Sequence, residues 1–343
     1  MQTLKRIEFI DLAKGICILM VLFFHIGIPD VPGIKYMRMP FYFVLSGLFF
    51  SDYGGFNNLL LKKTNKIFVP FLFFYVVSYF YFYLIRLSFP EYLPSNVHGI
   101  LDIFRSEWIY NGPIWFLLSL FWVNIIFYFV NKYGVNNWGR GVLVVLCAFL
   151  GYTLGKEDVY IIGYVATSLT SIPYFYVGYL LKQTNLLLSN KLDKYNLLFF
   201  VVFYSLALVM ERYTSSTHIW YLTNDFHGFP PIVYIRSLFG VFAILALCKV
   251  VKHLPLVSYL GRYSIVVLVL HRIVYRPIQI LFTNVLEIEE FISNCLTAVV
   301  VVSLFYFVLI PFCLKYIPKF ISQKDLIEEK DILRLKNVIF KRK

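Results

Sequence analysis

Residues 10–25 read IDLAKGICILMVLFFH, and this stretch decides the fold class. It is apolar apart from Asp11, Lys14 and His25, and it forms the centre of an apolar window over residues 8–26. A helix of that length crosses the roughly 30 Å hydrocarbon core of a bilayer. No small-residue cleavage pattern follows it, so we expect a retained first span and not a signal peptide.

The composition of the whole chain predicts an integral membrane protein. Of its 343 residues, 59% are hydrophobic and only 15% are charged, and the mean hydropathy of +0.72 exceeds that of a soluble globule. At roughly 30 residues for a span and its connection, the chain has room for about ten crossings. The net charge of +13 is typical of cytoplasmic loops in such a protein, so we expect no nucleic-acid partner.

Apolar windows recur along the chain and predict an all-α bundle of about ten transmembrane helices. They cover residues 8–26, 37–51, 67–87, 113–131, 140–155, 159–181, 196–211, 231–250, 256–276 and 292–314. Lys and Arg gather in alternate connections, as in residues 62–66 and 249–262. Because retained positive charge marks the cytoplasmic side, both termini are predicted to be cytoplasmic.

The chain is predicted to have one membrane domain and a tail. Residues 1–318 contain all the apolar windows. Residues 319–343 place apolar side chains among many charges, a pattern typical of a basic amphipathic helix on a membrane surface. We expect this tail to lie on the cytoplasmic side and to anchor the chain there.

The first window holds charged groups that need a partner or a function, because a charge at mid-membrane costs on the order of 3 kcal/mol. Asp11 and Lys14 are three residues apart, so they are neighbours on one helical face and can neutralise each other. Lys14 and His25 are eleven residues apart, close to three turns, which places the imidazole about 16 Å further along the same face. We expect a polar line across the membrane, whereas the alternative for His25 is a histidine buried for packing.

A second histidine is predicted in the outer half of the membrane, in the window 256–276. This is His271, and Arg272 follows it directly. A guanidinium there can hold an anionic group or stabilise an oxyanion. The five cysteines lie in apolar stretches without metal-type or redox-type spacing, and the histidines show no metal-ligand spacing, so no metal site is predicted.

Two further segments carry candidate binding residues. Ser46 and Gly47 interrupt an apolar run, and Gly47 would let a ligand chain or another helix approach closely, simple helix packing being the alternative. A cluster of three lysines follows and would suit the phosphates of a large anionic cofactor, ordinary cytoplasmic charge being the alternative. These lysines are Lys62, Lys63 and Lys66.

Four blocks of the sequence together resemble the membrane acyltransferase 3 family, in its short form without a fused extracytoplasmic domain, similar to the enterobacterial common antigen O-acetyltransferases. The first is a basic residue, ten intervening residues and a histidine, here Lys14 and His25. The others are MPFYFVLSGLFF (39–50) followed by KKTNKIFVPF (62–71), NGPIWFLLSLF (111–121) and LGRYSIVVLVLH (260–271). The family's first basic residue is often arginine, whereas Lys14 keeps the charge without the bidentate geometry.

The resemblance implies an acyltransferase of the bacterial cytoplasmic membrane. Such an enzyme moves an acyl group, usually acetyl, from cytoplasmic acyl-CoA to a hydroxyl of a cell-surface or secreted polysaccharide or of its lipid-linked precursor. Acetyl-CoA is therefore the expected co-substrate. The residues expected to hold it are Lys14, Ser46, Lys62, Lys63 and Lys66.

On this interpretation His25 stands where the thioester ends. An imidazole with a pKa near 6.5 can take the proton of a sugar hydroxyl or accept the acyl group itself, and both routes remain open. Asp11 would fix Lys14, while His271 and Arg272 would orient the acceptor or stabilise the oxyanion. The residues expected to bind the acceptor are Trp115, Asn111 and Asp225.

Two other functions compete with this interpretation. A transporter or flippase of a lipid-linked glycan would also have many spans, intramembrane charges and a through-going polar line. An acyltransferase acting on an amine or a lipid head group is the other alternative. A flippase leaves the mass of its substrate unchanged, whereas an acyltransferase adds an acyl unit. Transfer to an amine gives an amide, which, unlike an ester, survives mild base.

Overall fold

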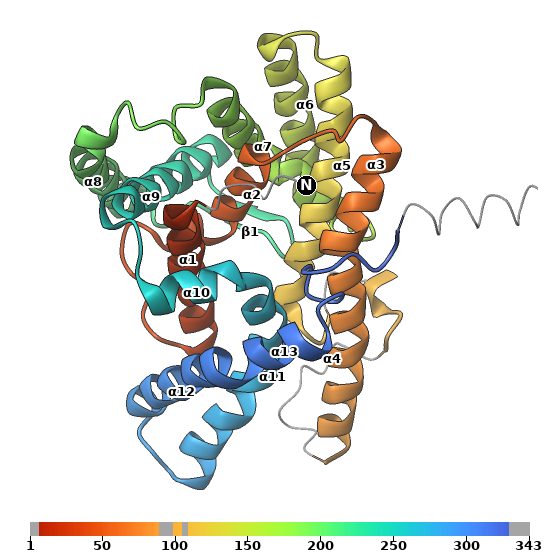
Figure 1. The fold of residues 1–343 in the computed structure, drawn as a ribbon, viewed down its shortest axis with the longest axis vertical. Helices are drawn as coiled ribbons and strands as arrows, with labels where there is room; N and C mark the ends of the chain where they lie inside the picture. The colour runs from red at the N-terminus through yellow and green to blue at the C-terminus, as the bar shows by residue number, and fades with distance from the viewer. Residues whose placement is uncertain (1–6, 89–98, 105–108, 329–343) are drawn as a thin grey trace, which may run out of the picture.

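The computed structural model describes residues 7–88, 99–104 and 109–328, and their helices pack into one bundle (Figure 1). The predicted all-α class is confirmed, because the regular elements of these residues are helical apart from two three-residue strands. The principal elements are α1 Glu8–Ile26, α2 Arg38–Leu48, α3 Phe56–Lys63, α4 Val69–Ser88, α5 Trp115–Tyr133, α6 Asn137–Lys156, α7 Val165–Thr184, α8 Asn196–Thr214, β1 His218–Trp220, β2 Asp225–His227, α9 Pro230–Val251, α10 Pro255–Arg262, α11 Ser264–Ile280, α12 Glu290–Leu304 and α13 Ile310–Tyr316. Short 3-10 helices cover Lys35–Met37, Asp102–Phe104, Gly112–Ile114 and Asp193–Tyr195, and π-helical segments cover Thr64–Phe68, Leu281–Val285 and Phe305–Leu309.

Eight helical segments in the described part of the chain are long and apolar enough to cross a membrane. The window 37–51 does not give a helix of spanning length, since α2 has only 11 residues. The window 159–181 gives α7, whose 20 residues include several hydroxyl side chains and Pro173 and which is not among the eight. We call the end of the bundle at which α1 begins the inner end and the end at which α1 finishes the outer end, following the predicted orientation.

The helices α2 and α7 contact each other backbone to backbone. A Cβ atom on Gly47 would lie 1.8 Å from the carbonyl oxygen of Phe175, and one on Gly178 would lie 1.9 Å from that of Val44. The short helix α2 and the longer helix α7 therefore pack closely within the bundle, as small residues allow in membranes. The structure thus supports helix packing as the role of Gly47.

The predicted continuous span 256–276 is wrong, because the chain breaks at Tyr263 into α10 and α11. A Cβ on Gly261 would lie 1.8 Å from the carbonyl oxygen of Asp11, and one on Gly15 would lie 2.0 Å from that of Val257. Close contact with α1 holds α10 in place, and a separate helix, α11, begins at Ser264. Figure 1 shows α10 crossing α1, with α9 and α12 on either side.

A buried arginine fixes the connection that carries the β1–β2 hairpin. Arg236 of α9 has no exposed surface. Its guanidinium donates hydrogen bonds to the carbonyl oxygens of Thr214 and Thr217 and lies 3.5 Å from the centre of the Tyr36 ring. Since an intramembrane charge needs such partners, Arg236 is explained by the loop that it holds.

The predicted amphipathic helix over 319–343 is wrong for residues 319–328, which form turns, and residues 329–343 lie outside the described part of the chain. The turns dock on the α3–α4 segment instead of lying free on a surface. Phe320 stacks on Phe73 with ring centres 4.1 Å apart, and the Asn65 side chain bonds the backbone of Leu326 and Ile327. Specific hydrogen bonds to α3–α4 therefore determine the conformation of this segment.

Candidate active site

Two histidines from distant parts of the sequence meet at the outer half of the bundle. The ring centres of His25 on α1 and His271 on α11 lie 5.1 Å apart. His271 is fully buried, whereas His25 is half-buried and its ring makes no hydrogen bond within the described residues. The sequence predicts each histidine separately, and the packing of α11 on α1 brings them together.

The backbone around His271 determines which ring nitrogen carries the proton. Its Nδ1 lies 3.0 Å from the carbonyl oxygen of Val267 and 2.8 Å from that of Leu268. Carbonyl oxygens only accept hydrogen bonds, so Nδ1 is the donor and Nε2 of the neutral ring carries a lone pair. This Nε2 is buried and has no hydrogen-bond partner in the part of the chain that the structure describes. A hydrogen-bond acceptor is thus held in the ring that contacts His25.

Two guanidinium groups neighbour the histidine pair, because Arg272 directly follows His271 and Arg38 lies over the ring of the residue before His25. Arg272 lies against Gly112, where a Cβ would come within 2.9 Å of its Nη1. Arg38 lies 4.1 Å above the ring of Phe24 and pairs with Asp30. Guanidinium groups in such a position can stabilise an anionic group next to an imidazole.

Sequence reasoning did not identify Arg38 or Asp30 as site residues. Arg38 is the second residue of the apolar window 37–51, at the start of that window. Its position directly before the apolar run MPFYFVLSGLFF was the available signal, because a charge at the start of a buried helix needs a partner. Asp30 is that partner, and it lies in the connection between the end of α1 at Ile26 and the start of α2.

The predicted pairing at the start of α1 is present. Lys14 Nζ lies 4.0 Å from a carboxylate oxygen of Asp11. Tyr42 of α2 donates a hydrogen bond to the Lys14 carbonyl oxygen over 3.1 Å. Tyr42 therefore ties α2 to α1 at Lys14, which lies eleven residues before His25 on α1.

The three lysines predicted to hold a cofactor form a basic patch at the inner end, and the described tail already contacts two of them. Asp325 lies 2.9 Å from Lys66 Nζ and 3.5 Å from Lys62 Nζ, and Lys66 lowers the pKa of this carboxyl through a hydrogen bond. Lys63 makes no ion pair within the described residues. A carboxylate of the same chain is therefore paired with two of the three lysines. Among the described residues, no three His, Cys, Asp or Glu side chains gather closely enough to hold a metal ion.

The four remaining predicted site residues each have different contacts. Ser46 accepts a hydrogen bond from Asn124 over 3.2 Å, between α2 and α5. Asn111 is buried and donates to Ser78 Oγ and to the carbonyl oxygen of Val269, two residues before His271. Trp115 is buried, with its ring centre 5.9 Å from that of Tyr164. Asp225 is exposed on the hairpin and pairs with His227 over 2.9 Å, without contact to the histidine pair in the described residues.

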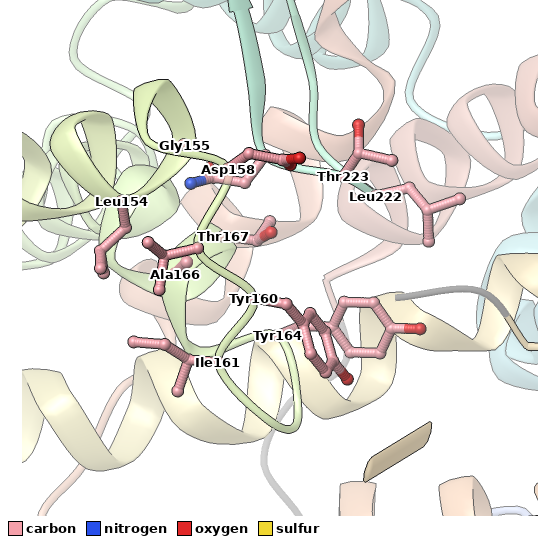
Figure 2. Close-up of a pocket in the computed structure, with 12 residues that line it drawn as sticks. Leu154, Gly155, Asp158, Tyr160, Ile161, Tyr164, Ala166, Thr167, Leu222 and Thr223 are labelled. Carbon is pink, nitrogen blue, oxygen red and sulfur yellow. The ribbon is translucent and has the colours of Figure 1, made fainter. Parts of the chain in front are cut away.

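A small pocket lies where the hairpin meets the α6–α7 connection (Figure 2). Figure 2 shows Tyr160 and Tyr164 facing it from one side and Leu222 and Thr223 from the hairpin. Its volume of about 20 Å³ is close to that of one water molecule. Tyr160 already donates to the carbonyl oxygen of Ile103, and Thr167 donates to that of Tyr221. This pocket is therefore a packing seam and has no room for a sugar.

One comparison with known proteins found a match for this chain. A family model described as an acyltransferase domain, of the acyltransferase 3 type, matches residues 7–315. The match covers the histidine pair, both arginines and the basic patch. No curated protein and no solved structure matches the chain. Together with its apolar helices, the match shows that the chain is a multi-pass membrane protein that belongs to the membrane acyltransferase 3 family.

Proposed function

We propose that the chain is an O-acyltransferase that moves an acetyl group from cytoplasmic acetyl-CoA to a hydroxyl of a surface or secreted polysaccharide, or of its lipid-linked precursor. The observation that carries this proposal is the contact between His25 and His271, with a lone pair held on His271 Nε2 and two guanidinium groups nearby. Acyl transfer needs a base and positive charge at one point, and this site contains both.

The reaction balances along two routes. In direct transfer, His25 takes the hydroxyl proton as the oxygen attacks the thioester carbonyl, the C–S bond breaks, and the proton passes to the sulfur of CoA. In the second route, a His25 nitrogen attacks the thioester carbonyl, the C–S bond breaks, and the ring N–H proton passes to the sulfur of CoA. The hydroxyl oxygen then attacks the acyl-imidazole, the C–N bond breaks, and the hydroxyl proton returns to the ring. Arg272 and Arg38 stabilise the oxyanion in either route.

The direct test uses the purified chain in lipid nanodiscs. It is mixed with [14C]acetyl-CoA and with glycan from cells that lack the chain. We expect label to enter the glycan and to be released by mild base, as an ester is. Label that resists base would indicate transfer to an amine, and no transfer to the glycan would contradict the proposal.

The basic patch gives a prediction about the acetyl-CoA site. Asp325→Asn removes the carboxylate that pairs with Lys62 and Lys66. These groups are 30% to 39% exposed, and exposed pairs of this kind contribute about 0–1 kcal/mol. We therefore expect the KM for acetyl-CoA to fall by about twofold to fivefold at low salt, and less at high salt. Steady-state kinetics with varied acetyl-CoA measure this.

The matched control for this variant is Asp52→Asn, which removes one acidic charge from an exposed turn before α3. Its KM for acetyl-CoA should not change. Because Lys66 lowers the pKa of Asp325, the carboxylate stays ionised at neutral pH. The ion pairs of Asp325 with Lys62 and Lys66 stabilise the docked tail above the unperturbed pKa of about 4. This stabilisation is lost as the pH falls through the lowered pKa of Asp325. An equal KM for wild type and Asp325→Asn at low salt would place acetyl-CoA elsewhere.

A further inference from the structure

A polar cavity of about 450 Å³ lies at the outer end, between the carboxyl-terminal part of α11 and the start of α12. Its polar lining residues are Arg276, Gln279, Thr283, Asn284 and Glu290. We call it the outer cavity. Its volume is within the range of about 300–1,000 Å³ that is usual for small-molecule sites.

The outer cavity lies next to the helix end that carries His25. Gln279 donates a hydrogen bond to the carbonyl oxygen of Ile26 over 2.7 Å and another to Asn294 Oδ1 over 2.6 Å. Ile26 directly follows His25. The amide of Gln279 therefore joins the wall of the cavity to the last turn of α1.

A row of polar residues on α11 connects the cavity to the histidine pair. His271, Tyr275 and Gln279 of α11 are four residues apart and follow one another along the helix, and Thr283 lies in the π-helical segment that continues it. The rings of His271 and Tyr275 stack with centres 6.3 Å apart, and Thr283 donates to the carbonyl oxygen of Gln279 over 2.8 Å. The eight residues from His271 to Gln279 span about 12 Å. An extended ligand in the cavity can therefore reach toward His25.

The charges of the lining indicate the class of ligand. Arg276 and Glu290 form no ion pair within the described residues, and the one hydrogen bond of the Arg276 guanidinium there is a long one of 3.4 Å to Gln279. One cation and one anion leave the lining without net charge, so it does not favour a phosphate. Amide, hydroxyl, guanidinium and carboxylate groups instead match the mixed donors and acceptors of sugar hydroxyls. The π-helical segment Leu281–Val285 forms part of the wall, and such segments are frequent at functional sites.

We propose that the outer cavity is the subsite for the acceptor glycan, where it binds the sugar unit next to the one that is acylated. This inference rests on the proposed function for the identity of the acceptor. Glu290 accepts hydrogen bonds from sugar hydroxyls, and Arg276 and Asn284 contact hydroxyl oxygens. The neighbouring sugar then presents its hydroxyl at His25.

The test measures glycan binding as well as transfer. Wild type, Glu290→Gln and Arg276→Gln in nanodiscs are titrated with the deacylated polysaccharide from cells that lack the chain, by microscale thermophoresis. We expect each variant to raise the Kd for the polysaccharide about tenfold, while the KM for acetyl-CoA stays unchanged. Glu287→Gln, in the same exposed connection but outside the lining, is the matched control and should bind like wild type.

The outcomes separate the subsite from the proposed function. If wild type transfers acetyl groups but both variants bind the polysaccharide as tightly as wild type, the cavity is not the subsite. A parallel titration measures binding to phosphatidylglycerol vesicles. If the variants bind the polysaccharide like wild type but bind these vesicles more weakly, the cavity holds a lipid head group and the inference is overturned. If wild type binds the polysaccharide through the cavity but transfers no acetyl group, the proposed function fails, and the cavity is a glycan-binding site but not an acceptor subsite.

Discussion

His25→Ala should lower the rate of acetyl transfer by about 10²–10⁴-fold, the usual contribution of a general acid–base group. The variant removes the half-buried imidazole of the histidine pair, and no other described histidine contacts His271. Initial rates with [14C]acetyl-CoA and deacylated glycan, at matched amounts of protein in nanodiscs, measure the loss.

The control for this variant is His253→Ala, an exposed histidine between α9 and α10, which should keep the wild-type rate. Quenching wild type after one turnover without acceptor separates the two routes, because label stays on the protein only if His25 carries the acyl group. A His25→Ala rate within twofold of wild type would remove His25 from the mechanism.

Gly261→Ala should destabilise the protein by about 3 kcal/mol or more, the upper range for overpacking a core. The added Cβ would lie 1.8 Å from the carbonyl oxygen of Asp11, so α10 and α1 would have to separate. Because backbone atoms meet there, no side-chain rotation relieves the clash. Thermal unfolding in detergent, followed by fluorescence-detected size exclusion, measures the loss.

Gly141→Ala is the matched control for the packing prediction. It makes the same substitution within helix α6, where the nearest atom would be 3.8 Å from the new Cβ. This variant should unfold at the wild-type temperature or slightly above it, because alanine favours a helix over glycine by about 1 kcal/mol. Equal unfolding temperatures for Gly261→Ala and wild type would mean that α10 does not pack on α1 as described.

Hydropathy predicted the long helices well because length and apolar composition decide whether a segment can span a bilayer. Hydropathy failed where contacts between distant segments determine the local structure. The break between α10 and α11 depends on glycine contacts with α1, and the shape of the tail depends on Asn65 and Phe73, which lie far away in the sequence. Periodicity within one segment contains no information about such partners.

In the candidate active site, contacts within one helix were predictable, and contacts between helices were not. The pairing of Asp11 with Lys14 was predictable because both lie on one helix three residues apart. The contact of His25 with His271 and the pairing of Arg38 with Asp30 depend on how α1, α2 and α11 pack. The position of Asp325 between two lysines more than 250 residues earlier depends in the same way on packing.

Mass spectrometry of the surface glycan tests the central claim most directly. Cells with the wild-type chain are compared with cells that lack it. An O-acyltransferase predicts one acyl unit that is present only with wild type and is removed by mild base. Glycans of equal mass in both strains, exported in different amounts, would contradict that claim and would indicate a transporter.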